Sequence, residues 1–311
     1  MPSTESLRTI VFSHANGFPA GTYRSLFDIW RAAGFTVHAI EKYGHDPRFP
    51  VTSNWPHLRD QLLHFIDHEV GGPAHLVGHS MGGYLSLLAA SRRPDLARTV
   101  VLLDSPVVSG WKARALQISK ATGLGERFSP AHVSRRRRQH WPSAQAAFDH
   151  FAAKAAFARW APDVLRDYIA SGMEADTEVG RASALGQRLS FTRDVETAIY
   201  GSVPHHLARL LRAHPLHCPA AYIGGTRSHE GKLAGLIATK RLTEGRVSML
   251  DGSHLFAMER PAEAAAEVLR WIEALSLDRL PAAAASAESA STSASASAAP
   301  SRGAAADTPR L

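Results

Sequence analysis

Residues 75–83 read HLVGHSMGG, a stretch in which an apolar run ends at a serine flanked by glycines. The serine lies in a G-x-S-x-G pattern, with a strand-like run before it and an amphipathic helical pattern after it. A serine on such a tight strand-to-helix turn has a strained backbone, and neighbouring glycines remove side chains that would collide. The end of a parallel strand is also where open α/β sheets bind ligands. We therefore predict that Ser80 is a nucleophile on an elbow formed with Gly78, His79 and Gly82.

Six short runs rich in Val, Ile and Leu alternate with longer helical patterns along the chain. The apolar residues in these runs are mostly consecutive, as expected for strands that are covered on both faces. The repeated strand–helix–strand order predicts an α/β fold, with a mostly parallel sheet of about six strands and helices on both faces. The predicted strands are residues 8–14, 36–42, 74–80, 99–105, 220–225 and 246–250.

The alternation stops in the middle of the chain. Residues 106–215 are rich in Ala and Arg, show helical patterns and contain no convincing parallel strand, so we predict a helical cap inserted into an α/β core formed by 1–105 and 216–280. Residues 281–311 contain 13 Ala and 7 Ser among 31 positions. Such a segment buries too little apolar surface to offset its ordering entropy, which predicts a disordered tail.

The positive charge is concentrated in the predicted cap. The 311 residues have a formal net charge of +7, and residues 108–214 hold 16 Lys and Arg against 9 Asp and Glu, whereas the rest of the chain holds 19 of each sign. The run Arg135 to Arg138 belongs to this excess. It is interpreted either as a solvated helix face or as a site for an anionic substrate or an acidic partner. No interleaved aromatic platform or known binding module accompanies the arginines, so we predict no nucleic-acid partner.

The composition also bears on the compartment. Cys218 is the single cysteine, which excludes an intramolecular disulfide and a cysteine metal cluster. The first residues lack the basic start and apolar run of a signal peptide, and no stretch approaches the roughly 18 apolar residues of a membrane span. We expect a cytoplasmic protein with no membrane span, and no metal or cofactor is required by the predicted chemistry.

Three motifs resemble those of the α/β-hydrolase fold superfamily, in particular serine esterases and lipases. They are GHSMGG (78–83), SHANGFPAGTYR (13–24) and DGSHLFAMERP (251–261), and the resemblance covers residues 8 to about 276. A serine hydroxyl needs a base to take its proton. The resemblance implies that this base is a late histidine after the last strand, and His254 occupies that place.

The acid that orients the histidine is less obvious. In the family it usually lies in the loop after the next-to-last strand, but Arg227 and Ser228 stand where an aspartate would normally fall. Some family members, including a subset of haloalkane dehalogenases, carry the acid on the strand after the nucleophile helix, where this chain has Asp104. Glu230 lies in the usual loop, slightly after the position where the aspartate normally falls. We favour Asp104 and keep Glu230 as the alternative.

The oxyanion hole requires two backbone N–H groups aimed at the developing negative charge. The resemblance implies that Met81 supplies one and that the loop after the first strand supplies the other. That loop resembles both the His-Gly-x-Pro loop of epoxide hydrolases and esterases, which favours Phe18, and the His-Ala-Gly-Gly loop of type II thioesterases, which favours Ala15. We favour Ala15. His14 and Asn16 are predicted to line the site, with a buried, loop-supporting role as the alternative for His14.

These features predict an acyl-serine reaction on a small-molecule acyl substrate. The positive charge of the predicted cap favours an anionic substrate. Epoxide hydrolases and haloalkane dehalogenases use an aspartate at the elbow, whereas this chain has Ser80. Carboxylic ester hydrolysis with a Ser-His-Asp/Glu triad is the favoured activity. Thioester hydrolysis, C–C bond hydrolysis and lactone opening are alternatives on the same machinery, and a non-catalytic, ligand-binding member of the fold is a further alternative.

Overall fold

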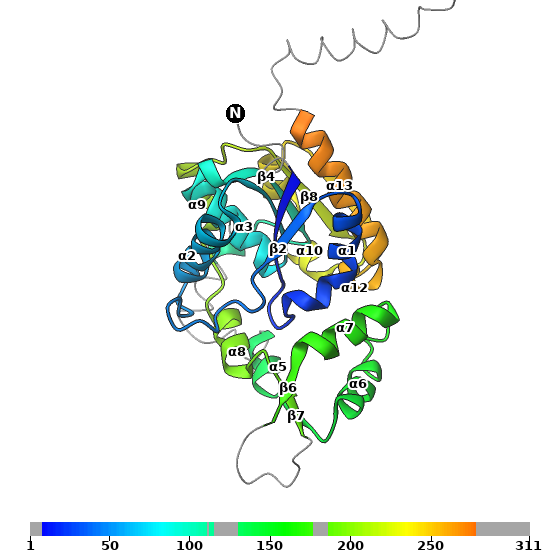
Figure 1. The fold of residues 1–311 in the computed structure, drawn as a ribbon. Helices are drawn as coiled ribbons and strands as arrows, with labels where there is room; N and C mark the ends of the chain where they lie inside the picture. The colour runs from blue at the N-terminus through cyan, green and yellow to red at the C-terminus, as the bar shows by residue number, and fades with distance from the viewer. Residues whose placement is uncertain (1–7, 111, 115–129, 177–185, 278–311) are drawn as a thin grey trace, which may run out of the picture.

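A six-stranded parallel sheet forms the centre of the computed structural model, which describes residues 8–110, 112–114, 130–176 and 186–277 (Figure 1). The strand order is β2-β1-β3-β4-β8-β9, and every neighbouring pair is parallel. This confirms the predicted α/β fold. The predicted tail at 281–311 lies outside the described residues. The strands are β1 (Thr9–Ser13), β2 (Thr36–Ala39), β3 (Ala74–His79), β4 (Ala97–Leu103), β8 (Ala220–Gly225) and β9 (Val247–Leu250).

Helices cover both faces of the sheet (Figure 1). On one face, α1 (Arg24–Ala32) and α13 (Pro261–Leu277) pack together, and the Trp30 indole N–H donates to the Ala265 carbonyl at 3.1 Å. On the other face lie α2 (Pro56–Phe65), α3 (Met81–Arg92) and α9 (Leu207–Ala213). Alternate residues of each strand point to opposite faces, so the sheet contributes to two separate apolar cores.

The remaining helices are short or belong to the segment between β4 and β8. Among the described residues, none of the helices combines the length and apolar character needed to cross a bilayer. The α-helices are α5 (Pro130–Arg135), α6 (Ala144–Ala152), α7 (Pro162–Gly172), α8 (Arg193–Gly201), α10 (His229–Ala234), α11 (Ile237–Leu242) and α12 (Phe256–Glu259). Two short 3-10 helices are η2 (Ala20–Tyr23) and η4 (Pro94–Leu96), and η3 (Ile66–Val70) is a π-helical turn that continues α2.

The segment between β4 and β8 is not purely helical. It contains an antiparallel sheet in the order β5-β7-β6, formed by β5 (His140–Trp141), β6 (Met173–Ala175) and β7 (Gln187–Leu189). Strands of two or three residues are too short for an alternating pattern to be read from sequence. Helices α5 to α8 lie together at one end of the main sheet (Figure 1), whereas α9 shares an apolar core with α3.

The turn from β3 into α3 brings backbone against backbone. A Cβ on Gly82 would lie 1.9 Å from the Ser13 carbonyl oxygen at the end of β1, and one on Gly78 would lie 2.3 Å from the Gly82 backbone. Real Cβ atoms do not approach other atoms so closely. The glycines therefore let α3 begin directly against the carboxyl ends of β1 and β3.

We predict that Gly82→Ala lowers the free energy of unfolding by at least about 2 kcal/mol, because the added methyl group would force the α3 and β1 backbones apart. Gly72→Ala is the matched control, since nothing lies within 4 Å of a Cβ at Gly72. Its effect should stay within about 0.5 kcal/mol. Urea denaturation of both variants measures the difference, and equal stabilities would contradict the close approach.

Candidate active site

Ser80 occupies the sharp turn between β3 and α3. Its backbone has φ 53° and ψ −113°, a strained conformation for a residue with a side chain. The Ser105 hydroxyl donates to the Ser80 carbonyl at 2.9 Å and helps to hold this turn. The Ser80 Oγ lies 3.0 Å from Nε2 of His254, within hydrogen-bond distance. The structure thus brings together the predicted nucleophile and the predicted base, which are 174 residues apart in the chain.

His254 lies in the loop that follows β9. Its Nδ1 is 2.6 Å from Oδ2 of Asp104, and because an ionised carboxylate only accepts, Nδ1 carries the proton. Nε2 is then free of a proton and can accept one from the Ser80 hydroxyl. The same loop is anchored by Glu259, whose carboxylate accepts from the Ser253 N–H at 3.0 Å. The ring is therefore fixed in the tautomer that a general base requires.

Asp104 is buried immediately after β4, with 1% of its surface exposed and a positive φ of 43°. Oδ1 accepts from the Gly225 N–H and the Tyr222 hydroxyl, each at 3.1 Å, and Oδ2 accepts from the Ser228 hydroxyl. Burial alone would raise the pKa of this carboxyl. The hydrogen bonds from His254, Ser228 and Gly225, together with the charge of His254, outweigh burial and lower the pKa, so Asp104 is ionised.

The loop that usually carries the acid supplies a donor to Asp104 instead. Ser228, which stands where an aspartate is common, donates its hydroxyl to Asp104. Glu230, the alternative acid, is half exposed, and its carboxylate lies 3.9 Å from Nδ1 of His254, beyond hydrogen-bond distance. Sequence reasoning missed the supporting roles of Tyr222, Gly225 and Ser228, because none of them belongs to a recognisable motif.

The charges around His254 shift its protonation. Burial lowers the pKa of the imidazole, but the hydrogen bond to Asp104 and the negative charges of Glu230 and Asp104 outweigh burial, so the pKa lies above its ordinary value. The same three side chains form the one group in the described part of the chain with donor atoms close enough for a metal ion. A metal there would have to replace the proton that Asp104 and His254 share.

His14, in the loop after β1, was predicted to line the site. His14 is fully buried, its Nε2 accepts from the Tyr43 N–H at 3.0 Å and its Nδ1–H donates to the Ala15 carbonyl at 2.8 Å. Burial lowers its pKa to about 4, so it is neutral. His14 therefore supports the loop from beneath and is not among the residues that line the cavity beside Ser80, which corrects the prediction that it lines the site.

The N–H groups of both predicted second oxyanion donors are already engaged. Ala15 donates its N–H to the Tyr23 hydroxyl at 3.1 Å, and Phe18 donates its N–H to the Ala15 carbonyl at 3.2 Å. Asn16 lies between them and lines the cavity beside Ser80. Within the described residues, neither the backbone N–H of Asn16 nor that of Met81 donates a hydrogen bond.

Tyr23 and His79 connect this loop to His254. Because the Tyr23 hydroxyl accepts from Ala15, it donates to Nδ1 of His79 at 2.7 Å, and His79 Nε2–H then donates to the His254 carbonyl at 2.9 Å. Burial and the nearby His254 charge lower the pKa of His79 to about 3, so the ring stays neutral. One hydrogen-bonded chain thus joins the loop after β1, the elbow and the loop after β9. Tyr23 lies in the SHANGFPAGTYR motif (13–24), which is the sequence signal that points to it.

A cavity of about 770 Å³, here called the catalytic cavity, opens beside Ser80. Its surface is predominantly apolar, with Lys112, Lys232 and Glu230 among its charged residues. The Lys112 ammonium donates to the carbonyls of Leu233 and Ala234. The other lining residues are Asn16, Trp55, Ser80, Met81, Tyr84, Asp104, Ser105, Pro106, Val108, Ile199, Tyr200, Val203, Leu233, Ala234 and His254.

Known proteins resemble this chain in sequence and in fold. A sequence model described as the alpha/beta hydrolase family matches residues 10–268. The chain is 33% identical to mouse monoglyceride lipase over 114 residues, which cover 34% of this chain and 37% of the mouse protein. It is 28% identical to a monoglyceride lipase homologue of monkeypox virus over 131 residues, covering 40% of this chain and 47% of that protein. The matches thus span less than half of these curated relatives.

Two solved structures illustrate the shared fold. E-2-(acetamidomethylene)succinate hydrolase superposes with a TM-score of 0.63 at 22% identity, over 85% of this chain and 91% of that one. A thioesterase domain from the curacin biosynthetic pathway superposes with a TM-score of 0.64 at 17% identity, over 86% of this chain and 92% of that one. At these identities the likeness establishes the fold and leaves the substrate open.

Replacing each acid separately should distinguish their roles. If neutral His254 acts as the base, we predict that activity falls as the pH drops through the raised pKa of this histidine. We predict that Asp104→Asn lowers kcat by roughly 10⁴-fold, because the amide no longer holds the required tautomer. Glu230→Gln removes a charge that raises the His254 pKa, so its acidic limb should move to lower pH while kcat on the plateau stays within about threefold of the wild type. The pH profile for hydrolysis of p-nitrophenyl butyrate measures both, and exchanged effects would make Glu230 the orienting acid.

Removing the Tyr23 hydroxyl should displace the His254 loop indirectly, through the hydrogen bonds of His79. Tyr23→Phe leaves the Ala15 N–H and His79 Nδ1 buried without partners, which costs about 1–3 kcal/mol of stability. We predict a fall in kcat of about 10- to 100-fold from misplacement of the His254 loop. The acidic limb of the pH profile should not move, because His79 is neutral throughout. An unchanged kcat would exclude this positioning role.

Proposed function

Because this chain belongs to the alpha/beta hydrolase family, we propose that it is a serine hydrolase that cleaves a carboxylic ester through an acyl-serine intermediate. The strongest support is the continuous hydrogen-bonded chain from the Ser80 hydroxyl through His254 to Asp104, at 3.0 and 2.6 Å. A buried ionised acid, a histidine of fixed tautomer and a serine on a strained turn are the three elements that nucleophilic catalysis by serine requires.

In the proposed reaction, Ser80 Oγ attacks the ester carbonyl carbon while His254 Nε2 takes the hydroxyl proton. Asp104 stabilises the imidazolium that forms. The tetrahedral intermediate collapses, the C–O bond to the alcohol breaks and His254 returns the proton to the leaving oxygen. Water then attacks the acyl-serine with His254 again as base, which releases the acid and regenerates Ser80.

The oxyanion is proposed to be held by the backbone N–H groups of Met81 and Asn16. Met81 follows the nucleophile at the N-terminus of α3, where the helix dipole also favours negative charge. Asn16 replaces Ala15 and Phe18 in this role, because their N–H groups are engaged by Tyr23 and by the Ala15 carbonyl. Asn16 also lines the catalytic cavity together with Met81.

The acyl chain would occupy the apolar part of the catalytic cavity. Trp55, Ile199, Val203 and Leu233 provide a surface on which a hydrocarbon chain loses contact with water. Hydrolysis of a thioester or of an activated C–C bond would use the same residues, so these remain alternatives. A comparison of p-nitrophenyl butyrate with butyryl-CoA separates ester from thioester preference.

Covalent labelling tests the proposed nucleophile directly. We predict that a fluorophosphonate probe labels the wild-type protein, whereas Ser80→Ala abolishes labelling and His254→Ala slows it by at least about 10³-fold. Mass spectrometry of the labelled peptide should place the adduct on Ser80. An unlabelled but folded wild-type protein would favour the non-catalytic, ligand-binding alternative.

A further inference from the structure

A second cavity of about 890 Å³ lies between the inserted segment and the loop after β1. Here called the cap cavity, it is lined from α6, from α8 and from the residues in and after α5. Phe18, Phe151 and Phe157 give it aromatic walls. It differs from the catalytic cavity in its charge.

Four arginine and lysine side chains line the cap cavity. They are Arg136, Arg137, Arg138 and Lys154. Among its described lining residues the single carboxylate is Glu196, which lies 2.8 Å from Arg137. Within the described part of the chain, no carboxylate lies within ion-pair distance of the other three. The cavity therefore carries an uncompensated positive charge.

Ring faces and a backbone carbonyl hold two of these cations in place of carboxylates. The Lys154 ammonium lies 5.1 Å from the centre of the Phe151 ring. The Arg138 guanidinium lies 5.4 Å from the centre of a Trp141 ring, and its Nε donates to the His140 carbonyl at 2.8 Å. Such contacts orient a cation without neutralising it.

The electrostatics of the neighbouring groups reflect this excess. Burial and then the charge of Arg137 lower the pKa of Lys154. Burial, followed by the charges of Lys154, Arg138 and Arg137, lowers the pKa of His150. The buried Nε2 of His150 has no hydrogen-bond partner among the described residues. A bound anion would relieve this repulsion and favour the charged forms.

The cap cavity adjoins the catalytic cavity. Tyr200 lines both, and Phe18 follows the catalytic cavity's Asn16 by two positions. Between them, a Cβ on Gly17 would lie 2.8 Å from the Glu196 carboxylate and 3.1 Å from the Arg137 guanidinium. The Asn16 side-chain amide donates to the Glu196 carbonyl at 2.9 Å. The Arg137–Glu196 pair thus packs directly on the loop that carries the proposed oxyanion donor.

From this arrangement we propose that the cap cavity binds a carboxylate or phosphate group of the acyl substrate that Ser80 cleaves. The substrate class is then an anionic ester or thioester, with its reacting carbonyl in the catalytic cavity and its charged group among Arg136, Arg138 and Lys154. This inference rests on the proposed function for its reaction and on the charge of the cavity for its substrate class.

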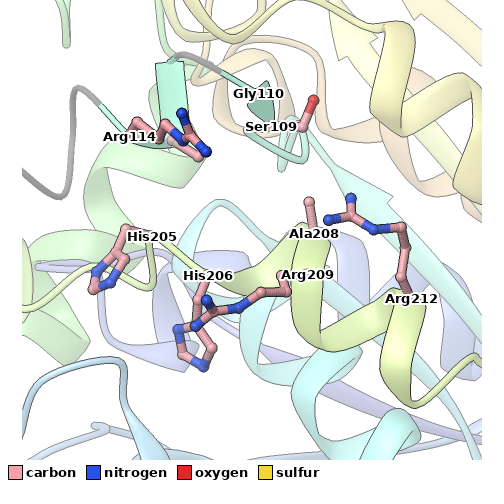
Figure 2. Close-up of a pocket in the computed structure, with 9 residues that line it drawn as sticks. Ser109, Gly110, Arg114, His205, His206, Ala208, Arg209 and Arg212 are labelled. Carbon is pink, nitrogen blue, oxygen red and sulfur yellow. The ribbon is translucent and has the colours of Figure 1, made fainter.

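Another basic cavity provides a matched control. In Figure 2, Arg209 and Arg212 from α9 lie across a cavity of about 500 Å³ from Arg114. This cavity shares no lining residue with the catalytic cavity. Charge reversal there changes the net charge of the protein by the same amount as in the cap cavity, but at a different place.

The experiment compares matched neutral and anionic substrates. One pair is p-nitrophenyl hexanoate and the mono-p-nitrophenyl ester of adipate, which tests a carboxylate. The other pair is the hexanoyl thioester of N-acetylcysteamine and hexanoyl-CoA, which tests phosphate. We expect Arg136→Glu/Lys154→Glu to lower the anionic-to-neutral ratio of kcat/KM at least about tenfold in one pair. The control double variant Arg209→Glu/Arg212→Glu should leave both ratios within about twofold of the wild type.

The outcomes separate the two proposals. A wild-type enzyme that prefers neither anionic substrate, or a control variant that loses the preference equally, overturns the cap-cavity assignment while leaving the serine hydrolase intact. If the wild type hydrolyses nothing, titration calorimetry of hexanoyl-CoA and adipate against Ser80→Ala decides the assignment. Binding that weakens at least about tenfold on charge reversal in the cap cavity supports the anion site without hydrolysis, and no binding of either ligand overturns it.

Discussion

The contact between the start of α3 and the carboxyl ends of β1 and β3 is the constraint on which the site depends. Gly82 and Gly78 permit it, because any side chain at these positions would overlap backbone atoms. The contact fixes Ser80 in its strained turn and sets the loop after β1 beside the elbow. Asn16 and Met81 thereby come to line one cavity with Ser80.

The surroundings of Asp104 reflect the cost of burying a carboxylate. Asp104 is almost completely buried, and an ionised carboxylate in such a place needs several donors to replace water. The Gly225 N–H and the hydroxyls of Tyr222 and Ser228 come from β8 and the loop after it. Residues of β8 and of the loop after it therefore supply hydrogen bonds to Asp104, which follows β4 and accepts from His254. Glu230 adds negative charge near the ring from a half-exposed position.

The inserted segment contributes charge as well as shape. Its arginines pack against aromatic rings and against the loop after β1, and Arg137 with Glu196 forms a partly buried ion pair at that contact. A buried ion pair repays its desolvation only with good geometry, so it serves better as a fixed point of attachment than as a source of stability. Through this pair, Arg137 is held against the loop that carries Asn16.

The sequence by itself determined the sheet, the order of its six strands along the chain and the elbow, because continuous apolar runs and clustered glycines reflect constraints within a few residues. It also singled out Ser80 and His254, from motifs that lie at the ends of predicted strands. Only the tertiary structure shows how differently Asp104 and Glu230 are placed, since Asp104 is buried among donors more than 100 residues away in the chain and Glu230 is half exposed. It also showed that Tyr23 engages the Ala15 N–H and that short antiparallel strands occur in the inserted segment. These features depend on contacts between segments that are distant in sequence, and such contacts leave no local sequence pattern.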